Sequence, residues 1–181
     1  AMVLLLVCTM MTAITIVREK EMGTMELMLV SPMKPFRIVL AKAVPYLLLS
    51  AVNIGSILLL SVFLLEVPIN GSITLLLAES ILFTLVSLSL GLLISAGAAS
   101  QQSAMFISLV AMLLPTVMLS GYMFPIENMP VPLQVISNIV PSKWFYQIVK
   151  NVMIKGVGLE HVWKETLILA GMMLFLLTVS I

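Results

Sequence analysis

The chain has 181 residues, of which 61% are hydrophobic and only 9% charged, and its formal net charge is +1. A soluble domain carries about 25% charged residues, so this composition excludes an ordinary water-soluble globule. With a mean hydropathy of +1.22, the sequence predicts an all-α, polytopic membrane protein, and its small net charge gives no reason to expect a nucleic-acid partner.

Five stretches are long and apolar enough to cross a bilayer, or nearly so. A hydrocarbon core of about 30 Å requires about 20 helical residues, and the alternation typical of barrel strands is missing. The expected spans are residues 1–17, 37–65, 73–97, 103–122 and 162–181. Because both ends of the sequence fall inside apolar runs, we expect one membrane domain over residues 1–181, cut from a longer protein.

The segment 18–35, between the first two spans, is unusually charged. Eight of the chain's seventeen charged residues (nine Lys or Arg and eight acidic) fall between Arg18 and Lys42. We expect the first helix to continue through Arg18, Glu19 and Lys20 and to end at Gly23, in the left-handed conformation that glycine tolerates. The five Lys and Arg of this loop and its margins indicate that it is cytoplasmic.

A short helix is expected to follow within the same segment. Thr24 can cap it, and the carboxylate of Glu26 complements the dipole of its first turn. Ser31 and Pro32 end it, because a residue before proline is held extended. Its apolar edge consists of Met25, Met28 and Leu29. Two interpretations remain open, namely an amphipathic helix on the inner leaflet and a docking helix that receives force from a cytosolic partner.

Glu79 is the one carboxylate well inside a predicted span. It lies about 10 Å along the helix from Ser72, and an acidic side chain in the membrane is costly and often functional. One interpretation places Glu79 on a polar translocation path. The other places it at the outer interface or against a neighbouring helix.

The segment 123–161 is expected to be external by alternation of the spans, although its three lysines argue mildly for the other side. Ser142 can cap a helix that Gly156 ends, which predicts short helices at 132–139 and 143–155. Lys143 is expected on the polar face of the second helix, and Trp144, Phe145 and Tyr146 at the membrane–water interface. The helices either dip into the outer leaflet or form a lid on the bundle.

Catalytic and nucleotide-binding motifs are missing from the sequence. There is no phosphate-binding G-x-x-x-x-G-K-[ST] loop, and His161 is the lone histidine, outside any H-E-x-x-H pattern. Cys8 lies in an apolar run and is expected to be a buried packing residue. We therefore expect no enzyme activity, bound metal or cofactor in this chain, and any ATP that drives it would be hydrolysed elsewhere.

The run REKEMGTMELMLVSP resembles the cytoplasmic coupling segment of type 2 ATP-binding-cassette exporter permeases. The matching residues are Arg18, Glu19, Lys20, Gly23, Thr24, Glu26, Leu29, Ser31 and Pro32. The run LSGYMFPIENMP resembles the same family's segment before the last membrane helix. The matching residues there are Leu119, Ser120, Gly121, Phe124, Pro125, Asn128, Met129 and Pro130. The two motifs occur in the family's order, and the resemblance covers nearly the whole chain.

The resemblance implies a fold of six membrane helices, of which this chain would supply the second to sixth. It implies an exporter permease in a bacterial or archaeal cell membrane, paired with a second permease as a homodimer or heterodimer. ATP and Mg²⁺ would bind a partner ABC ATPase that docks on residues 18–35. The external segment 123–161 would form re-entrant or interfacial helices, with Trp144 near the membrane–water interface. The alternative is a membrane anchor, scaffold, channel or secondary carrier without ATPase coupling.

Overall fold

The computed structural model describes residues 2–23, 35–63, 71–121 and 123–180, with the backbone alone at 35–43, 58, 61 and 62. These residues form helices and their connections, with no strand among them. The five long helices are α1 (Met2–Glu21), α3 (Pro35–Phe63), α4 (Ile73–Gly97), α5 (Gln101–Leu119) and α8 (Leu159–Ser180). The short ones are η1 (Ile126–Asn128), α6 (Val131–Ser137) and α7 (Pro141–Met153). The expected all-α class is confirmed for the described part of the chain.

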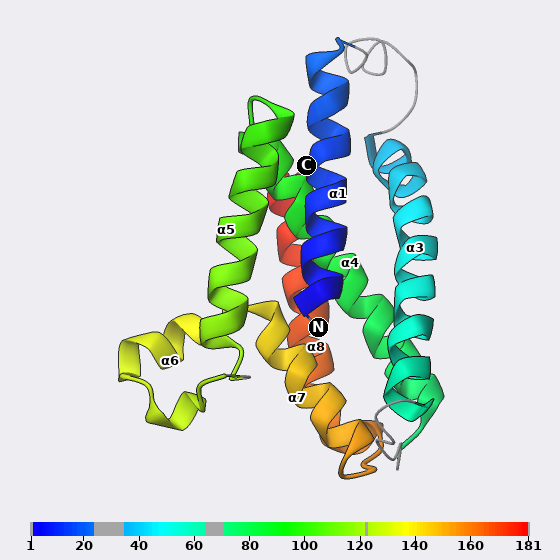
Figure 1. Ribbon diagram of the computed structural model, residues 1–181, viewed down its shortest axis with the longest axis vertical. Coiled ribbons are helices and arrows are strands. Elements are labelled where there is room, and N and C mark those ends of the chain that lie inside the picture. The colour runs from blue at the N-terminus through cyan, green and yellow to red at the C-terminus, as the bar shows by residue number, and fades with distance from the viewer. Residues whose placement is uncertain (1, 24–34, 64–70, 122, 181) are drawn as a thin grey trace.

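Successive long helices run in opposite directions (Figure 1). The end of α1, the start of α3 and the α4–α5 turn lie together at the upper end of the view. The start of α4, α7 and the start of α8 lie toward the lower end. The two segments that the sequence singles out, 18–35 and 123–161, therefore leave the long helices at opposite ends of the bundle.

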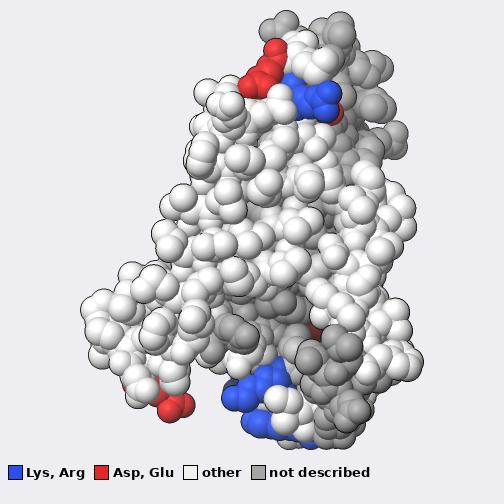
Figure 2. Space-filling view, in the orientation of Figure 1, with Lys and Arg blue, Asp and Glu red and all other residues white. Residues whose placement is uncertain are grey.

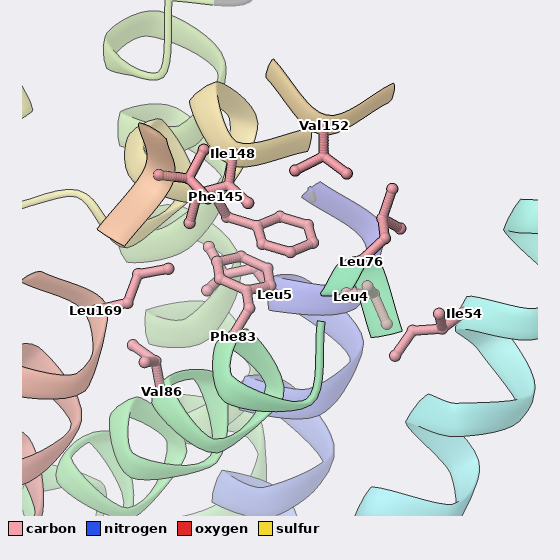
Figure 3. Close-up of a cluster of buried hydrophobic side chains, with 11 residues drawn as sticks. Leu4, Leu5, Ile54, Leu76, Phe83, Val86, Phe145, Ile148, Val152 and Leu169 are labelled. Atoms are coloured by element: carbon pink, nitrogen blue, oxygen red, sulfur yellow. The ribbon is translucent and has the colours of Figure 1, made fainter. Parts of the chain in front are cut away.

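Helix α4 is central and packs against α1, α3, α5, α7 and α8. The main core forms around it, and Figure 3 shows apolar side chains of α1, α4, α7 and α8 converging there. Its members are Leu4, Leu5, Ile54, Leu76, Phe83, Val86, Phe145, Ile148, Val152, Val162 and Leu169. The Phe83 and Phe145 rings are stacked, with centroids 4.2 Å apart. Phe145 is therefore a core residue, and its expected place at the membrane–water interface is wrong.

Small residues and hydroxyls bring α1 and α4 close together. A Cβ on Gly91 would lie 2.7 Å from both the Cβ of Thr12 and the carbonyl oxygen of Thr9. Nearby, the Thr9 hydroxyl donates a 3.1 Å hydrogen bond to the backbone oxygen of Ser87. Because lipid tails are as apolar as leucine, close packing and polar contacts of this kind associate helices inside a membrane.

Four of the described helices, α1, α4, α5 and α8, are long and apolar enough to cross a membrane. In α3 the stretch identified as apolar, Val44–Ile57, is shorter. The charged side chains visible in Figure 2 lie near the two ends of the molecule, and a broad band between them carries none on that face. This distribution is the one expected of a multi-pass membrane protein, whose charges stay outside the hydrocarbon.

Five helices, α3, α5, α6, α7 and α8, begin one to three residues before their predicted starts, and the local structure explains the difference for α5 and α7. α5 begins at Gln101 rather than 103, because Ser100 and Ser103 form a reciprocal capping box. Ser142 is not the cap of α7, since that helix begins at Pro141, whose missing N–H costs nothing at this position. The Ser142 hydroxyl instead lies 3.3 Å from the hydroxyl of Thr116 in α5.

Candidate functional site

The end of α1 has the geometry that the charged run predicts. The helix continues to Glu21, and the Met22 N–H donates to the carbonyl of Arg18 (3.0 Å). Gly23 has φ +70°, and its N–H donates to the carbonyl of Lys20 (3.2 Å). The left-handed conformation expected of Gly23 is confirmed. The residues from Thr24 to Pro32, including the expected short helix, lie outside the described part of the chain.

The Lys20 side chain connects the end of α1 to the end of α4. Its Nζ donates a 2.5 Å hydrogen bond to the backbone oxygen of Ser95. Ser95 lies in the last turn of α4, where carbonyl groups have no partner within their own helix and the dipole favours a cation. Lys20 therefore satisfies one of these carbonyls from a second helix.

Glu21, the last residue of α1, connects the same end of that helix to α5. Glu21 Oε1 accepts from the backbone N–H of Gln101 (3.0 Å), and Oε2 accepts from the side-chain Nε2 of Gln101 (2.5 Å). Gln101 is the first residue of α5, where the backbone N–H groups need outside acceptors. The sequence shows neither partner, because Glu21 and Gln101 are 80 positions apart.

A second, smaller core supports this end of the bundle. Ala13 and Val17 of α1 pack with Ala98 and Ala104 of the α4–α5 region, and Ile94 covers them. Small side chains at these positions let the three helices approach closely. Together with the bonds of Lys20 and Glu21, this packing fixes the point from which residues 24–34 depart. We call this arrangement of Arg18 to Gly23 on the α4–α5 turn the charged end of α1.

At the other end of the bundle, the predicted external residues line an apolar cavity. Gly121 has φ +80°, and a Cβ there would lie 3.1 Å from the Ile126 side chain. The apolar cavity has a volume of about 510 Å³. Its walls are Leu114, Pro115, Met118, Leu119, Phe124, Pro125, Asn128, Met129, Pro130 and Leu133. Phe124, Pro125, Asn128 and Pro130 are thus brought together, whereas Trp144 does not line this cavity.

Trp144 belongs to the junction of α6 and α7. Its Nε1 donates to the backbone oxygen of Asn138 (2.9 Å), and the Lys143 Nζ lies 5.1 Å from its ring centroid. Lys143 Nζ also donates to Ser137 Oγ (3.1 Å) and Asn138 Oδ1 (2.5 Å). Although the sequence places Lys143 on the polar face of α7, the side chain is buried, with 8% of its surface exposed. This burial lowers the pKa of Lys143 from its ordinary value.

A second cavity, of about 400 Å³, lies where α1, α3, α5 and α7 meet. Its apolar wall consists of Met2, Val3, Ile57 and Val117. Four residues with hydroxyl groups, Thr116, Ser120, Ser142 and Tyr146, complete the lining. Such a mixture of apolar surface and a few polar groups is usual for cavities that bind small molecules.

Glu79 contacts a neighbouring helix rather than either of these cavities. It is 3% exposed, and its Oε1 forms a 2.6 Å hydrogen bond with the Thr166 hydroxyl of α8. Of the two interpretations made from sequence, the contact with a neighbouring helix is the one present, and a place on a translocation path stays a prediction. No local pattern connects Glu79 with Thr166, because 87 positions separate them in the sequence.

Comparisons with known proteins identify relatives of this chain. A family model described as "ABC-2 family transporter protein" matches residues 1–181. In Escherichia coli strain K12, the probable multidrug ABC transporter permease YbhR is 34% identical over 165 residues, or 91% of this chain and 45% of that protein. YbhS, described in the same words, is 36% identical over 81% of this chain and 39% of its own length.

A eukaryotic relative is also similar. ABC transporter G family member 20 of Dictyostelium discoideum is 29% identical over 94% of this chain, which corresponds to 23% of that protein. The chain spans less than half the length of these curated relatives. No solved structure matches it.

Proposed function

This chain belongs to the ABC-2 family of transporter proteins, and we propose that it is the membrane-spanning permease of an ATP-driven exporter. The proposal is supported by the similarity to YbhR and YbhS, which are both described as permeases. ATP and Mg²⁺ would bind a separate ABC ATPase, since the sequence contains no phosphate-binding loop. The chain itself would move substrate and catalyse no reaction.

The proposed topology has five spans in this chain, formed by α1, α3, α4, α5 and α8. The charged end of α1 would face the cytoplasm, and α6 and α7 would lie in or on the outer leaflet as re-entrant or interfacial helices. A second permease, identical or different, would complete the transport path. Glu79 remains a candidate for that path through the cavity that two permeases would enclose.

The observation that carries the proposal is the attachment of the charged end of α1. Lys20 bonds to the end of α4 and Glu21 to the start of α5, directly before Gly23. A short helix over residues 24–30 that an ATPase displaced would therefore act on three membrane helices at once. A loop without such bonds would absorb the displacement. Residues 18–32 would thus transmit force from ATP hydrolysis to the bundle.

The experiment changes the coupling segment in the full-length protein, reconstituted with its ATPase in vesicles. Gly23→Val opposes the left-handed backbone at a cost of roughly 1 kcal/mol or more, and Glu26→Lys reverses a charge on the expected docking helix. We expect both variants to insert and dimerise, to transport less, and to lose substrate stimulation of ATP hydrolysis. Met22→Val, at the exposed preceding residue, is the matched control and should keep both activities.

Full transport and full substrate stimulation in both variants would remove the main support for ATPase coupling. The permease proposal would then give way to an anchor, a channel or a carrier that no ATPase drives. Loss of stimulation together with loss of membrane insertion would also count against the proposal, because it would assign Gly23 and Glu26 to folding rather than to coupling.

A further inference from the structure

The contact between α4 and α8 contains a buried carboxyl group that is only half satisfied. Glu79 Oε1 lies 2.6 Å from Thr166 Oγ1, and Glu79 Oε2 has no hydrogen-bond partner within the described residues. At 3% exposure, the side chain is also shielded from solvent. A carboxylate in such a place would leave a negative charge on an oxygen that no donor reaches, which is among the costliest arrangements in a protein interior.

The Thr166 hydroxyl lies within hydrogen-bond distance of two oxygen atoms. Its Oγ1 lies 2.6 Å from Glu79 Oε1 and also 2.9 Å from the backbone oxygen of Val162. A hydroxyl has one proton to donate, and the Val162 carbonyl can only accept. If the hydroxyl proton points at Val162, the contact with Glu79 is a hydrogen bond only when the carboxyl group donates. Both contacts are therefore satisfied together only by a protonated Glu79.

A second carboxylate reinforces this assignment. Glu165, next to Thr166 on α8, is close enough to act on Glu79 as a like charge. Its own Oε2 is buried and has no hydrogen-bond partner among the described residues. Two carboxyl groups in one poorly solvated region cannot both ionise at low cost, so an ionised Glu165 further favours the protonated form of Glu79.

The charged groups of the neighbouring helices α7 and α8 do not neutralise Glu79. On α8, Glu160, His161 and Lys164 are exposed. On α7, Lys150 is exposed and Lys143 bonds to Ser137 and Asn138 instead.

The remaining neighbours of α4 supply no cation at this level either. Glu79 is the sole charged residue of α4, and α5 has none. The charges of α1 lie at its far end, from Arg18 to Glu21, and Arg37 and Lys42 belong to the start of α3 at that same far end. No described Lys, Arg or His is thus bonded to Glu79.

We propose that Glu79, Thr166 and Glu165 form a proton-binding site between α4 and α8. In this arrangement Glu79 is a neutral carboxylic acid that donates to Thr166 Oγ1, while Thr166 donates to Val162. Removal of the proton leaves two repelling carboxylates, and the single Thr166 proton can then serve either Glu79 or Val162 but not both, which weakens the α4–α8 contact. The site is a property of the bundle itself and holds whether or not the chain is an exporter.

Infrared spectroscopy tests the protonation directly, with the full-length protein in liposomes. At neutral pH the wild type should show the carbonyl stretch of a protonated carboxylic acid, shifted in deuterium oxide. Glu79→Gln should abolish this band. Glu160→Gln, which changes an exposed carboxyl group on α8, is the matched control and should retain it. A wild type without the band, or a band that survives Glu79→Gln, overturns the proposal.

The pH dependence of thermal unfolding provides the second measurement. The folded state holds a proton that the unfolded chain releases, so the stability of the wild type should fall as the pH rises through the titration of Glu79. Glu79→Gln should remove this fall, because an amide can still donate to Thr166 and does not ionise. Glu165→Gln removes a like charge, so Glu79 should release its proton at lower pH and the fall should end at lower pH than in the wild type. The same pH dependence in the wild type and Glu79→Gln would contradict the site.

Discussion

The carboxylate of Glu21 accepts hydrogen bonds from both nitrogens of Gln101, so that the last residue of α1 caps the first residue of α5. Glu21 lies inside the run REKEMGTMELMLVSP but is not one of its matching residues, and Gln101 lies far outside that run. The pair nevertheless decides what that run is attached to, because residues 24–34 begin three positions after Glu21. A force on the coupling segment would reach α5 through this pair and α4 through Lys20.

We predict that Glu21→Ala loosens the start of α5 without unfolding the bundle. Loss of this acceptor leaves the backbone N–H of Gln101 without its partner, so the first turn of α5 should open more often. Amide hydrogen exchange over residues 101–104 should therefore be faster than in the wild type. Gln102→Ala, at an exposed neighbouring position, is the control. Equal exchange in the wild type and Glu21→Ala would show that the pair does not stabilise α5.

We predict that Gly91→Ala destabilises the protein although alanine favours helix. The added Cβ would approach the Thr9 carbonyl and the Thr12 Cβ to 2.7 Å, so α1 and α4 must separate. Overpacking of this kind typically costs about 1–3 kcal/mol. Thermal unfolding in detergent measures the loss.

Gly55→Ala is the opposite control for Gly91, since a Cβ on Gly55 meets nothing within 4 Å. Helix propensity alone should raise stability there by up to about 1 kcal/mol. If both alanines change stability in the same direction and by similar amounts, the close α1–α4 approach at Gly91 is not what limits substitution.

We predict that Lys143→Met weakens the junction of α6 and α7. Methionine can occupy the space of the lysine stem, but it leaves Ser137 Oγ and Asn138 Oδ1 without their common donor. Ser137 is buried, and a buried acceptor deprived of its donor costs about 1–3 kcal/mol, whereas Asn138 is exposed and its Oδ1 can bond to water instead. Limited proteolysis between α6 and α7 should therefore be faster, whereas the exposed Lys150→Met should leave it unchanged. Equal cleavage of the two variants would count against the junction.

We predict that Met22 and Lys155 lie on opposite sides of the membrane. Both side chains are exposed, and they lie at opposite ends of the bundle. Single cysteines at these positions, in a background without the buried Cys8, should react with an impermeant thiol reagent from opposite sides. Labelling of both from one side would contradict the alternating arrangement of five spans.

Much of the fold was predictable because membrane helices are specified locally. Residues 73–97 were expected as one helix and form α4 over that range, since an apolar run must satisfy its backbone hydrogen bonds internally. Gly23 and Gly156 were expected to be left-handed and have φ +70° and +65°, because glycine adopts that conformation without a steric penalty. The roles proposed for residues 24–32 stay predictions.

The candidate sites depended on contacts that local patterns do not contain. Serine is a common helix-capping residue, yet α7 begins at Pro141 and the Ser142 hydroxyl contacts Thr116. Phe145 stood beside Trp144 and Tyr146 in an aromatic run, yet only Phe145 stacks on Phe83. Both predictions failed because these side chains have partners in α5 and α4, helices that lie far from them along the chain.

The sequence by itself determined that this is a helical membrane protein of the ABC-2 family, with its charge concentrated after the first helix. Composition and hydrogen-bond satisfaction in lipid allow few other solutions. Only the tertiary structure decided that Lys20 forms a hydrogen bond with Ser95, Glu21 with Gln101 and Glu79 with Thr166. These pairs join residues 75 to 87 positions apart, and their partners are chosen by how helices pack rather than by any property of the neighbouring sequence.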